Sequence, residues 1–125
     1  KSYPIKCVKN NKVKYNDMIH YNIIYTPVDQ KKSKGLYVYF LNHKVSFNDS
    51  LIKYSIVEKR NIFLYYVLYD DTIFKLTQKI IKINVINKKI DEVVQEIANK
   101  MSKIIKKYPE QYLWAHNRFN ISCVK

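Results

Sequence analysis

The chain has 125 residues, 47% of them hydrophobic, and a formal net charge of +13. This length fits one domain rather than two, and the share of apolar and aromatic residues excludes a disordered chain. No apolar run approaches the roughly 20 residues that a membrane-spanning helix needs. We therefore expect any membrane attachment to come from surface contacts or from a segment outside this sequence.

The positive charge favours negatively charged partners, but it does not identify which kind of partner this chain binds. Nucleic acid, anionic lipid head groups, lipid phosphates and acidic carrier proteins all respond to such a field. A solvated, lysine-rich surface encoded by an AT-rich gene explains many of the lysines equally well. Only Arg60 and Arg118 are arginines, and no recognition helix, zinc finger or aromatic RNA motif occurs, so the sequence disfavours nucleic acid.

Strands are predicted in the first third of the chain. The mostly apolar run from Asn22 to Val28 predicts a strand buried on both faces, as in a parallel sheet. Leu36 to Leu41 predicts a second strand. A helix capped by Asn48, Asp49 or Ser50 is expected to run to Lys59, and Asn61 suits the left-handed residue that often ends a helix.

The second half predicts a hairpin and a long helix. Ile62 to Tyr69 is the strongest strand signal, Asp70-Asp71 marks a turn, and the stretch from Thr72 to Val85 alternates as a strand with one exposed face. The helix is predicted by apolar residues at three- and four-residue steps, ending before Pro109. These residues are Val93, Val94, Ile97, Ala98, Met101, Ile104, Ile105 and Tyr108.

Together these elements predict one domain over residues 1–125, of the α/β class, with a mixed β-sheet flanked by helices. The histidines His20, His43 and His116 are scattered, and a single glycine excludes the glycine-rich phosphate and nucleophile motifs. Cys7 and Cys123 have no metal-ligand spacing. The residues alone therefore indicate no metal, no cofactor and no active site.

One segment after the predicted helix carries a specific pattern. Tyr108-Pro-Glu-Gln-Tyr-Leu-Trp-Ala-His-Asn-Arg-Phe119 resembles the carboxyl-terminal signature of the lipid A biosynthesis lauroyl/myristoyl acyltransferases. Asn117 departs from it, because that family usually has an arginine there. The matching positions are Pro109, Glu110, Gln111, Tyr112, Trp114, His116, Arg118 and Phe119.

A second segment resembles the same family. Thr26-Pro-Val-Asp-Gln30 matches a buried strand ending in Asp-Gln, and Gly35-Leu-Tyr-Val-Tyr-Phe40 is similar to the strand that follows it, with Tyr39 in place of a phenylalanine. The strand beginning at Ile62 lacks the family's prolines. The resemblance covers about residues 22 to 120. A convergent basic α/β domain is the competing interpretation.

The resemblance implies the carboxyl-terminal portion of a glycerolipid-acyltransferase-like αβα fold. Such an enzyme moves a fatty acyl chain from acyl carrier protein to a hydroxyl of a lipid A precursor, at the cytoplasmic face of the inner membrane. The family's catalytic motif is His-x4-Asp/Glu, in which imidazole takes the proton of the hydroxyl and the carboxylate orients it. Because Tyr25, Asn48 and Ile121 stand five positions after the three histidines, we expect the motif upstream of Lys1 and this chain alone to be inactive.

The resemblance also suggests roles for residues within the chain. Asp29 and Gln30 are expected near the active site, since ligand sites of α/β folds form where strands end. His116 and Arg118 are candidates for binding substrate phosphate or for docking the tail. Tyr112 and Trp114 are interfacial anchors or structural residues. Basic residues beside Asp29 would attract an acidic carrier protein or lipid phosphate; they are Lys31, Lys32 and Lys34.

A second class of function remains open. The chain is alternatively a non-enzymatic basic α/β module that binds anionic lipid or nucleic acid. The two classes differ in what the gene is expected to encode upstream of Lys1. A hydrophobic anchor and the His-x4-Asp/Glu motif there would indicate the acyltransferase, whereas an open reading frame that starts near Lys1 would indicate a degenerate remnant or a binding module.

Overall fold

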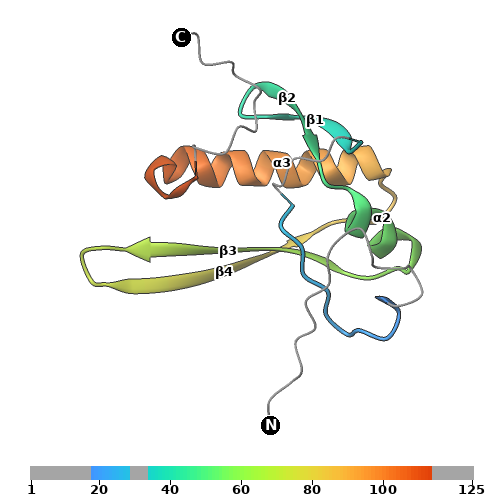
Figure 1. The fold of residues 1–125 in the computed structure, drawn as a ribbon, viewed down its shortest axis with the longest axis horizontal. Coiled ribbons are helices and arrows are strands. Elements are labelled where there is room, and N and C mark those ends of the chain that lie inside the picture. The colour runs from blue at the N-terminus through green and yellow to red at the C-terminus, as the bar shows by residue number, and fades with distance from the viewer. Residues whose placement is uncertain (1–17, 29–33, 114–125) are drawn as a thin grey trace.

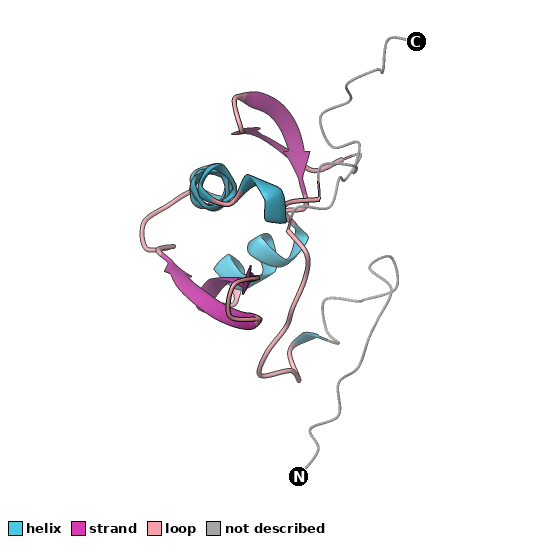
Figure 2. Ribbon diagram, turned by 90° about the vertical axis from the view of Figure 1, so that its left-hand side faces the viewer, coloured by secondary structure: helices cyan, strands magenta, loops and turns pink. Residues whose placement is uncertain are grey.

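The computed structural model describes residues 18–28 and 34–113. Its long helix lies between two separate pairs of strands (Figure 1), and a view from the side shows the same separation (Figure 2). The elements in chain order are β1 (Leu36–Phe40), β2 (His43–Phe47), α2 (Ser50–Val57), β3 (Ile62–Asp70), β4 (Lys75–Ile83), α3 (Ile90–Lys107) and the 3-10 helix η1 (Pro109–Gln111).

The first pair, β1 and β2, is an antiparallel hairpin closed by two residues. Phe40 pairs with His43 across the turn, and the two turn residues, Leu41 and Asn42, have φ values of 50° and 68°. Positive φ at both positions is the type I′ geometry that suits the twist of a hairpin. The sequence analysis did not predict β2, because Leu-Asn is a weak turn signal in place of the usual Asn-Gly.

The one glycine of the chain stands just before this hairpin, where a side chain does not fit. A Cβ atom at Gly35 would lie 2.1 Å from the carbonyl oxygen of Phe47. Backbone approach this close requires glycine. Gly35 therefore allows β1 to begin directly against the end of β2.

The short helix α2 confirms the prediction of a helix after Asn48. Asp49 occupies the N-cap position, and its carboxylate lies 2.6 Å from the ammonium group of Lys53 one turn later. The left-handed residue beyond the helix is Lys59, with a φ of 52°. The prediction that Asn61 takes this role was wrong by two residues, since the helix ends at Val57 rather than Lys59.

The second pair, β3 and β4, is a long antiparallel hairpin in regular register from Ile62↔Ile83 to Asp70↔Lys75. The predicted hairpin is thus confirmed, with its second strand beginning at Lys75 rather than Thr72. The carboxylate of Asp70 accepts hydrogen bonds from the backbone N–H and the hydroxyl of Thr72, at 3.0 and 2.6 Å. These bonds hold Thr72 in the turn, as Asp commonly does.

The long helix α3 is confirmed with the predicted inner stripe. At its start, the Glu92 carboxylate accepts a hydrogen bond from the Lys89 N–H, which is one arm of a capping box. Its buried face packs against β1, α2 and β4. This packing forms the core, whose most buried members include Phe40, Phe47, Ile83, Val93, Val94 and Ala98.

The structure shows the mixed α/β class, and it corrects the expected sheet. Among the described residues the strands form two separate two-stranded sheets, both antiparallel, so the single mixed sheet flanked by helices is not present there. The run from Asn22 to Val28 was predicted as a strand, and its described residues form none. A strand requires a hydrogen-bonded partner as well as suitable residues, and this run has no such partner.

Candidate functional site: an apolar cavity

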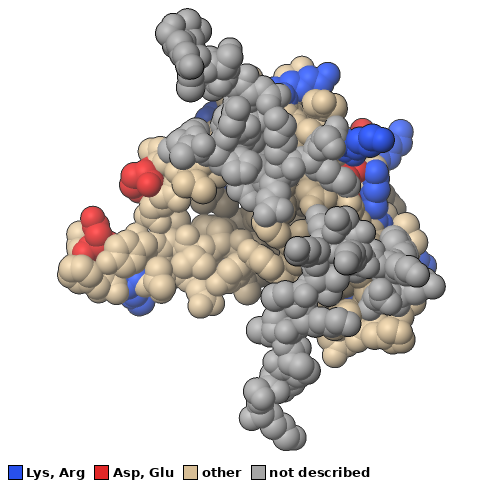
Figure 3. Space-filling model, viewed as in Figure 1, with Lys and Arg blue, Asp and Glu red and all other residues tan. Residues whose placement is uncertain are grey.

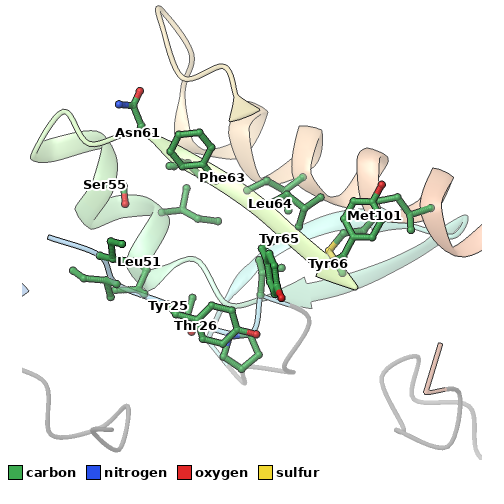
Figure 4. A pocket seen from close by; sticks show the side chains of 18 of the residues that line it. Tyr25, Thr26, Leu51, Ser55, Asn61, Phe63, Leu64, Tyr65, Tyr66 and Met101 are labelled. Carbon is green, nitrogen blue, oxygen red and sulfur yellow. The ribbon is translucent and has the colours of Figure 1, made fainter. Parts of the chain in front are cut away.

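The described part contains a cavity of about 920 Å³ between β3, α3, α2 and the segment 22–28 (Figure 4). Leu64 and Tyr66 point from β3 toward α3, which contributes Met101 to the wall. The volume lies at the upper end of the range for sites that enclose small molecules. Most of the wall is apolar, including Ile24, Leu51, Ile52, Leu64, Met101 and Ile104.

The apolar wall follows from the secondary structure of two elements. On α3, Ile97, Met101, Ile104 and Tyr108 recur at helical spacing along one side. On β3, Leu64 and its alternate neighbours face α3 because side chains alternate across a strand. Sequence analysis assigned the α3 stripe to the core alone, whereas part of it lines the cavity.

Arg60 holds the segment that forms the outer wall. Its Nη1 donates to the carbonyl oxygen of Tyr21 and its Nη2 to that of Ile19, the latter at 3.2 Å. The guanidinium also lies over the ring of Tyr54, 5.4 Å from the centroid. A planar fork of donors suits two neighbouring carbonyls at once. Arg60 therefore fixes the start of segment 22–28 beside the start of β3.

One edge of β3 faces this segment without pairing to it. The backbone groups of Tyr69 bond to Gln111 and so point away from β4. Since backbone direction alternates along an antiparallel strand, those of Phe63, Tyr65 and Val67 point the same way. Within the described ranges, no backbone hydrogen bond joins this edge to segment 22–28, and both line the cavity instead.

After α3, two residues of the acyltransferase-like signature contact the rest of the domain. Gln111 bonds to the backbone of Tyr69 at 2.8 and 2.9 Å. Tyr112 is half-buried, and its ring meets that of Phe40 edge-on at 6.2 Å between centroids. Of the two roles expected for Tyr112, the geometry supports the structural one.

The other predicted site residues lie outside the described ranges. These are Asp29, Gln30, Trp114, His116 and Arg118, together with Lys31 and Lys32. Lys34 is described and exposed. The structure therefore brings one predicted site residue, Tyr112, to the cavity wall. It adds Arg60, Met101 and Tyr66, which the sequence analysis did not assign to a site.

The two carboxylates with a lowered pKa lie outside the cavity wall and belong to the scaffold. The pKa of Glu96 is lowered, first by its hydrogen bond with Lys88 and then by the charges of Lys88 and Lys100. The pKa of Asp70 is lowered by the Thr72 hydroxyl. His43 is exposed, with Nδ1 2.8 Å from the carbonyl oxygen of Leu41. The described residues include no group of three metal-ligating side chains, and no described helix meets the length and apolarity of a bilayer span.

The cavity thus has apolar walls, a rim that Arg60 organises, and no general base of the His-x4-Asp/Glu type in the sequence. Comparison with models of known protein families and with curated proteins found no match to this chain.

Proposed function

We propose that this chain is the carboxyl-terminal portion of an acyltransferase of the lipid A type, and that the apolar cavity receives the fatty acyl chain. The observation that carries the proposal is the cavity itself, whose wall is built from α3, β3 and segment 22–28. An apolar chain leaves water at a gain of about 0.8 kcal/mol per methylene. A module that binds charged surfaces does not require an apolar cavity of this volume.

Two features of the chain connect the cavity with the sequence resemblance. Segment 22–28 forms its outer wall and leads directly to Asp29 and Gln30, the residues expected near the active site. Gln111 and Tyr112, from the carboxyl-terminal signature, also line it. Residues of both family-like patterns therefore line the same cavity, which supports a common role for them.

In this proposal the chain positions substrates and the catalytic base comes from the family's motif, which this sequence lacks. The acyl donor is acyl carrier protein, and the acceptor is a hydroxyl of a lipid A precursor at the inner-membrane surface. The net charge of +13 would attract both the acidic carrier and the lipid phosphates. The finer fold assignment, the αβα acyltransferase fold, belongs to the same proposal.

A binding series tests the proposal. Uncharged acyl-pantetheine thioesters of increasing length are titrated into the 125-residue chain by calorimetry. We expect affinity to rise by up to about fourfold per methylene, the factor equivalent to about 0.8 kcal/mol, until the cavity is full. Met101→Trp, which narrows the cavity, should weaken binding of the longer acyl chains, and Ile86→Trp, at an exposed position outside it, should not.

The same binding series distinguishes the proposed acyl-binding function from the alternative, a basic module that binds anionic surfaces. A basic module would ignore acyl length, and would instead bind anionic vesicles or oligonucleotides with an affinity that falls steeply as salt rises. Length-independent binding, or binding that Met101→Trp leaves unchanged, would contradict the proposed site. We expect no acyl transfer by this chain alone, and measurable transfer would show that another base acts.

A further inference from the structure

The β3–β4 hairpin has one covered face and one bare face. Leu64 points toward α3 and is 8% exposed, whereas its neighbours Phe63 and Tyr65 are 55% and 42% exposed. We call the bare side the outer face. It consists of Phe63, Tyr65, Val67 and Tyr69 from β3, and Leu76, Gln78, Ile80 and Lys82 from β4, which the register pairs across the two strands.

This outer face is larger than a single domain usually leaves in water. Six of its eight side chains are large and apolar, and each is between 41% and 68% exposed. At about 150–250 Å² for a large side chain, they expose on the order of 600 Å², and Ile73 and Phe74 at the hairpin end raise this to on the order of 900 Å². Patches of this size mark interaction sites, and a lone two-stranded hairpin is marginal without cover.

We propose that the outer face binds the outer face of a second copy of this chain across a two-fold axis. The two hairpins would stack as the layers of a small sandwich, about 10 Å apart. A standard stable interface buries about 800 Å² on each partner, which is the area that the hairpin offers. A two-fold interface needs only one self-complementary patch, so no further surface is required.

The charges at the two ends of the outer face complement each other in this arrangement. Asp71 is exposed in the turn at the hairpin end, and Lys82 is exposed on the outer face near its base. A two-fold axis that lies between the two faces and crosses the strands at the level of Val67 reverses one hairpin on the other. Asp71 of each copy then lies at the level of Lys82 of the partner, so each interface brings two such pairs within reach.

The projecting end of the hairpin carries charges of both signs. Asp70 and Asp71 lie there, and Lys75 is the register partner of Asp70. Figure 3 shows acidic and basic side chains on this part of the surface.

The outer face lies on the side of the hairpin opposite the buried Leu64, while Phe63, Tyr65 and Val67 also border the cavity. The proposal rests on the exposed apolar area of this face and not on the acyl-binding function, and sedimentation measures association in the absence of any acyl ligand.

Sedimentation equilibrium of the full chain tests the dimer. Salt should strengthen it, because salt screens the repulsion between two copies of net charge +13 while apolar contacts persist. Val67→Lys, at the centre of the outer face, should weaken the dimer by at least about 30-fold, as expected for a hot-spot residue. Val57→Lys makes the same change at a position 67% exposed on α2 and should leave the dimer intact.

A charge exchange tests the arrangement. Asp71→Lys and Lys82→Asp should each weaken the dimer, and the double variant should recover most of the loss. Circular dichroism confirms that each variant is folded. A chain that stays monomeric at high salt, or a dimer indifferent to Val67→Lys, overturns the proposal. A monomer that binds uncharged phosphatidylcholine vesicles through Val67 overturns it as well, and assigns the outer face to lipid.

Discussion

The carboxamide of Gln111 bonds to both backbone groups of Tyr69. The Tyr69 N–H donates to Oε1 at 2.8 Å, and Nε2 donates to the Tyr69 carbonyl oxygen at 2.9 Å. Gln95 makes the same pair with Tyr39 of β1, at 2.9 and 2.7 Å. A carboxamide presents a donor and an acceptor side by side, so each glutamine occupies an edge position where a further strand would otherwise add.

Replacing Gln111 should therefore loosen the tail and open the edge of β3. Gln111→Ala removes two hydrogen bonds that are partly exposed, at a cost of about 1–2 kcal/mol in the free energy of unfolding. Gln111→Glu should cost at least as much, because a carboxylate cannot donate to the Tyr69 carbonyl oxygen and instead faces it. Urea denaturation measures both.

Lys103→Ala is the control, because Lys103 lies exposed on α3, away from Gln111 and from the outer face. It should change stability by less than about 0.5 kcal/mol, as surface substitutions usually do. If Gln111→Ala lowered stability no more than Lys103→Ala, the paired hydrogen bonds would contribute nothing to the docking of the tail.

The turn between β1 and β2 allows a test at one position. Asn42 has a φ of 68°, and asparagine and glycine tolerate this left-handed conformation where other residues do not. Asn42→Ala should lower the free energy of unfolding by about 1 kcal/mol, and Asn42→Gly should leave it unchanged or raise it slightly. Thermal melts of both variants give the comparison. Equal melting temperatures would argue against the type I′ geometry.

The ion-pair cluster at the start of α3 predicts an acid-sensitive contribution to stability. Glu96 lies between Lys88 and Lys100, and its pKa is lowered from 4.5, mainly by the hydrogen bond with Lys88. A carboxyl whose pKa is lower in the folded chain stabilises fully above its unfolded pKa. That contribution is lost as pH falls below about 4.5 toward the folded pKa.

Glu96→Gln should remove this part of the pH dependence. The variant should be less stable than the parent at neutral pH by up to about 1 kcal/mol, a modest value because the side chains are partly exposed. The difference should shrink as the pH is lowered from about 4.5. Urea titrations across that window measure it, and a difference that stays constant with pH would contradict the role of the Glu96 charge.

The sequence predicted those parts of the fold that depend on neighbouring residues, and it failed where the structure depends on residues far apart in the chain. The α3 stripe from Val93 to Tyr108 reports on the burial of a single element, and it was confirmed. The alternation after Thr72 identified a strand, but its apolar residues Leu76 and Ile80 are exposed, and Ile83 near the end of β4 is buried instead. β2 was missed because Leu41 and Asn42 form its turn without glycine. The run 22–28 was wrongly predicted as a strand, because Ile23, Ile24 and Tyr25 meet the local preference while pairing depends on distant residues.

The candidate site was less predictable for the same reason. Its wall combines α3 with β3 and with segment 22–28, which are separated by tens of residues. Gln111 was recognised as part of a pattern, but its partner Tyr69 lies 42 positions away. Arg60 was noticed in the sequence because it is one of two arginines. Its partners could not be predicted, because they are backbone carbonyl groups, which every residue has.

Arg60 gives the last prediction, because it ties segment 22–28 to the body. Lysine at this position carries a single ammonium group and cannot reach the carbonyl oxygens of both Tyr21 and Ile19 in the same geometry. Loss of one charge-assisted bond, about 1.5 kcal/mol, would raise the open population of the segment about tenfold. Hydrogen exchange of the peptide covering residues 19–28 in Arg60→Lys should therefore quicken by about that factor.

Lys103→Met, on the exposed side of α3, removes a charge without touching the segment and should leave this exchange unchanged. The exchange of α3 itself should remain slow in both variants, because its buried stripe does not depend on Arg60. Equal exchange in the parent chain and in Arg60→Lys would mean that apolar contacts with the cavity wall hold segment 22–28. In that case the acyl-chain site would keep its outer wall without the guanidinium.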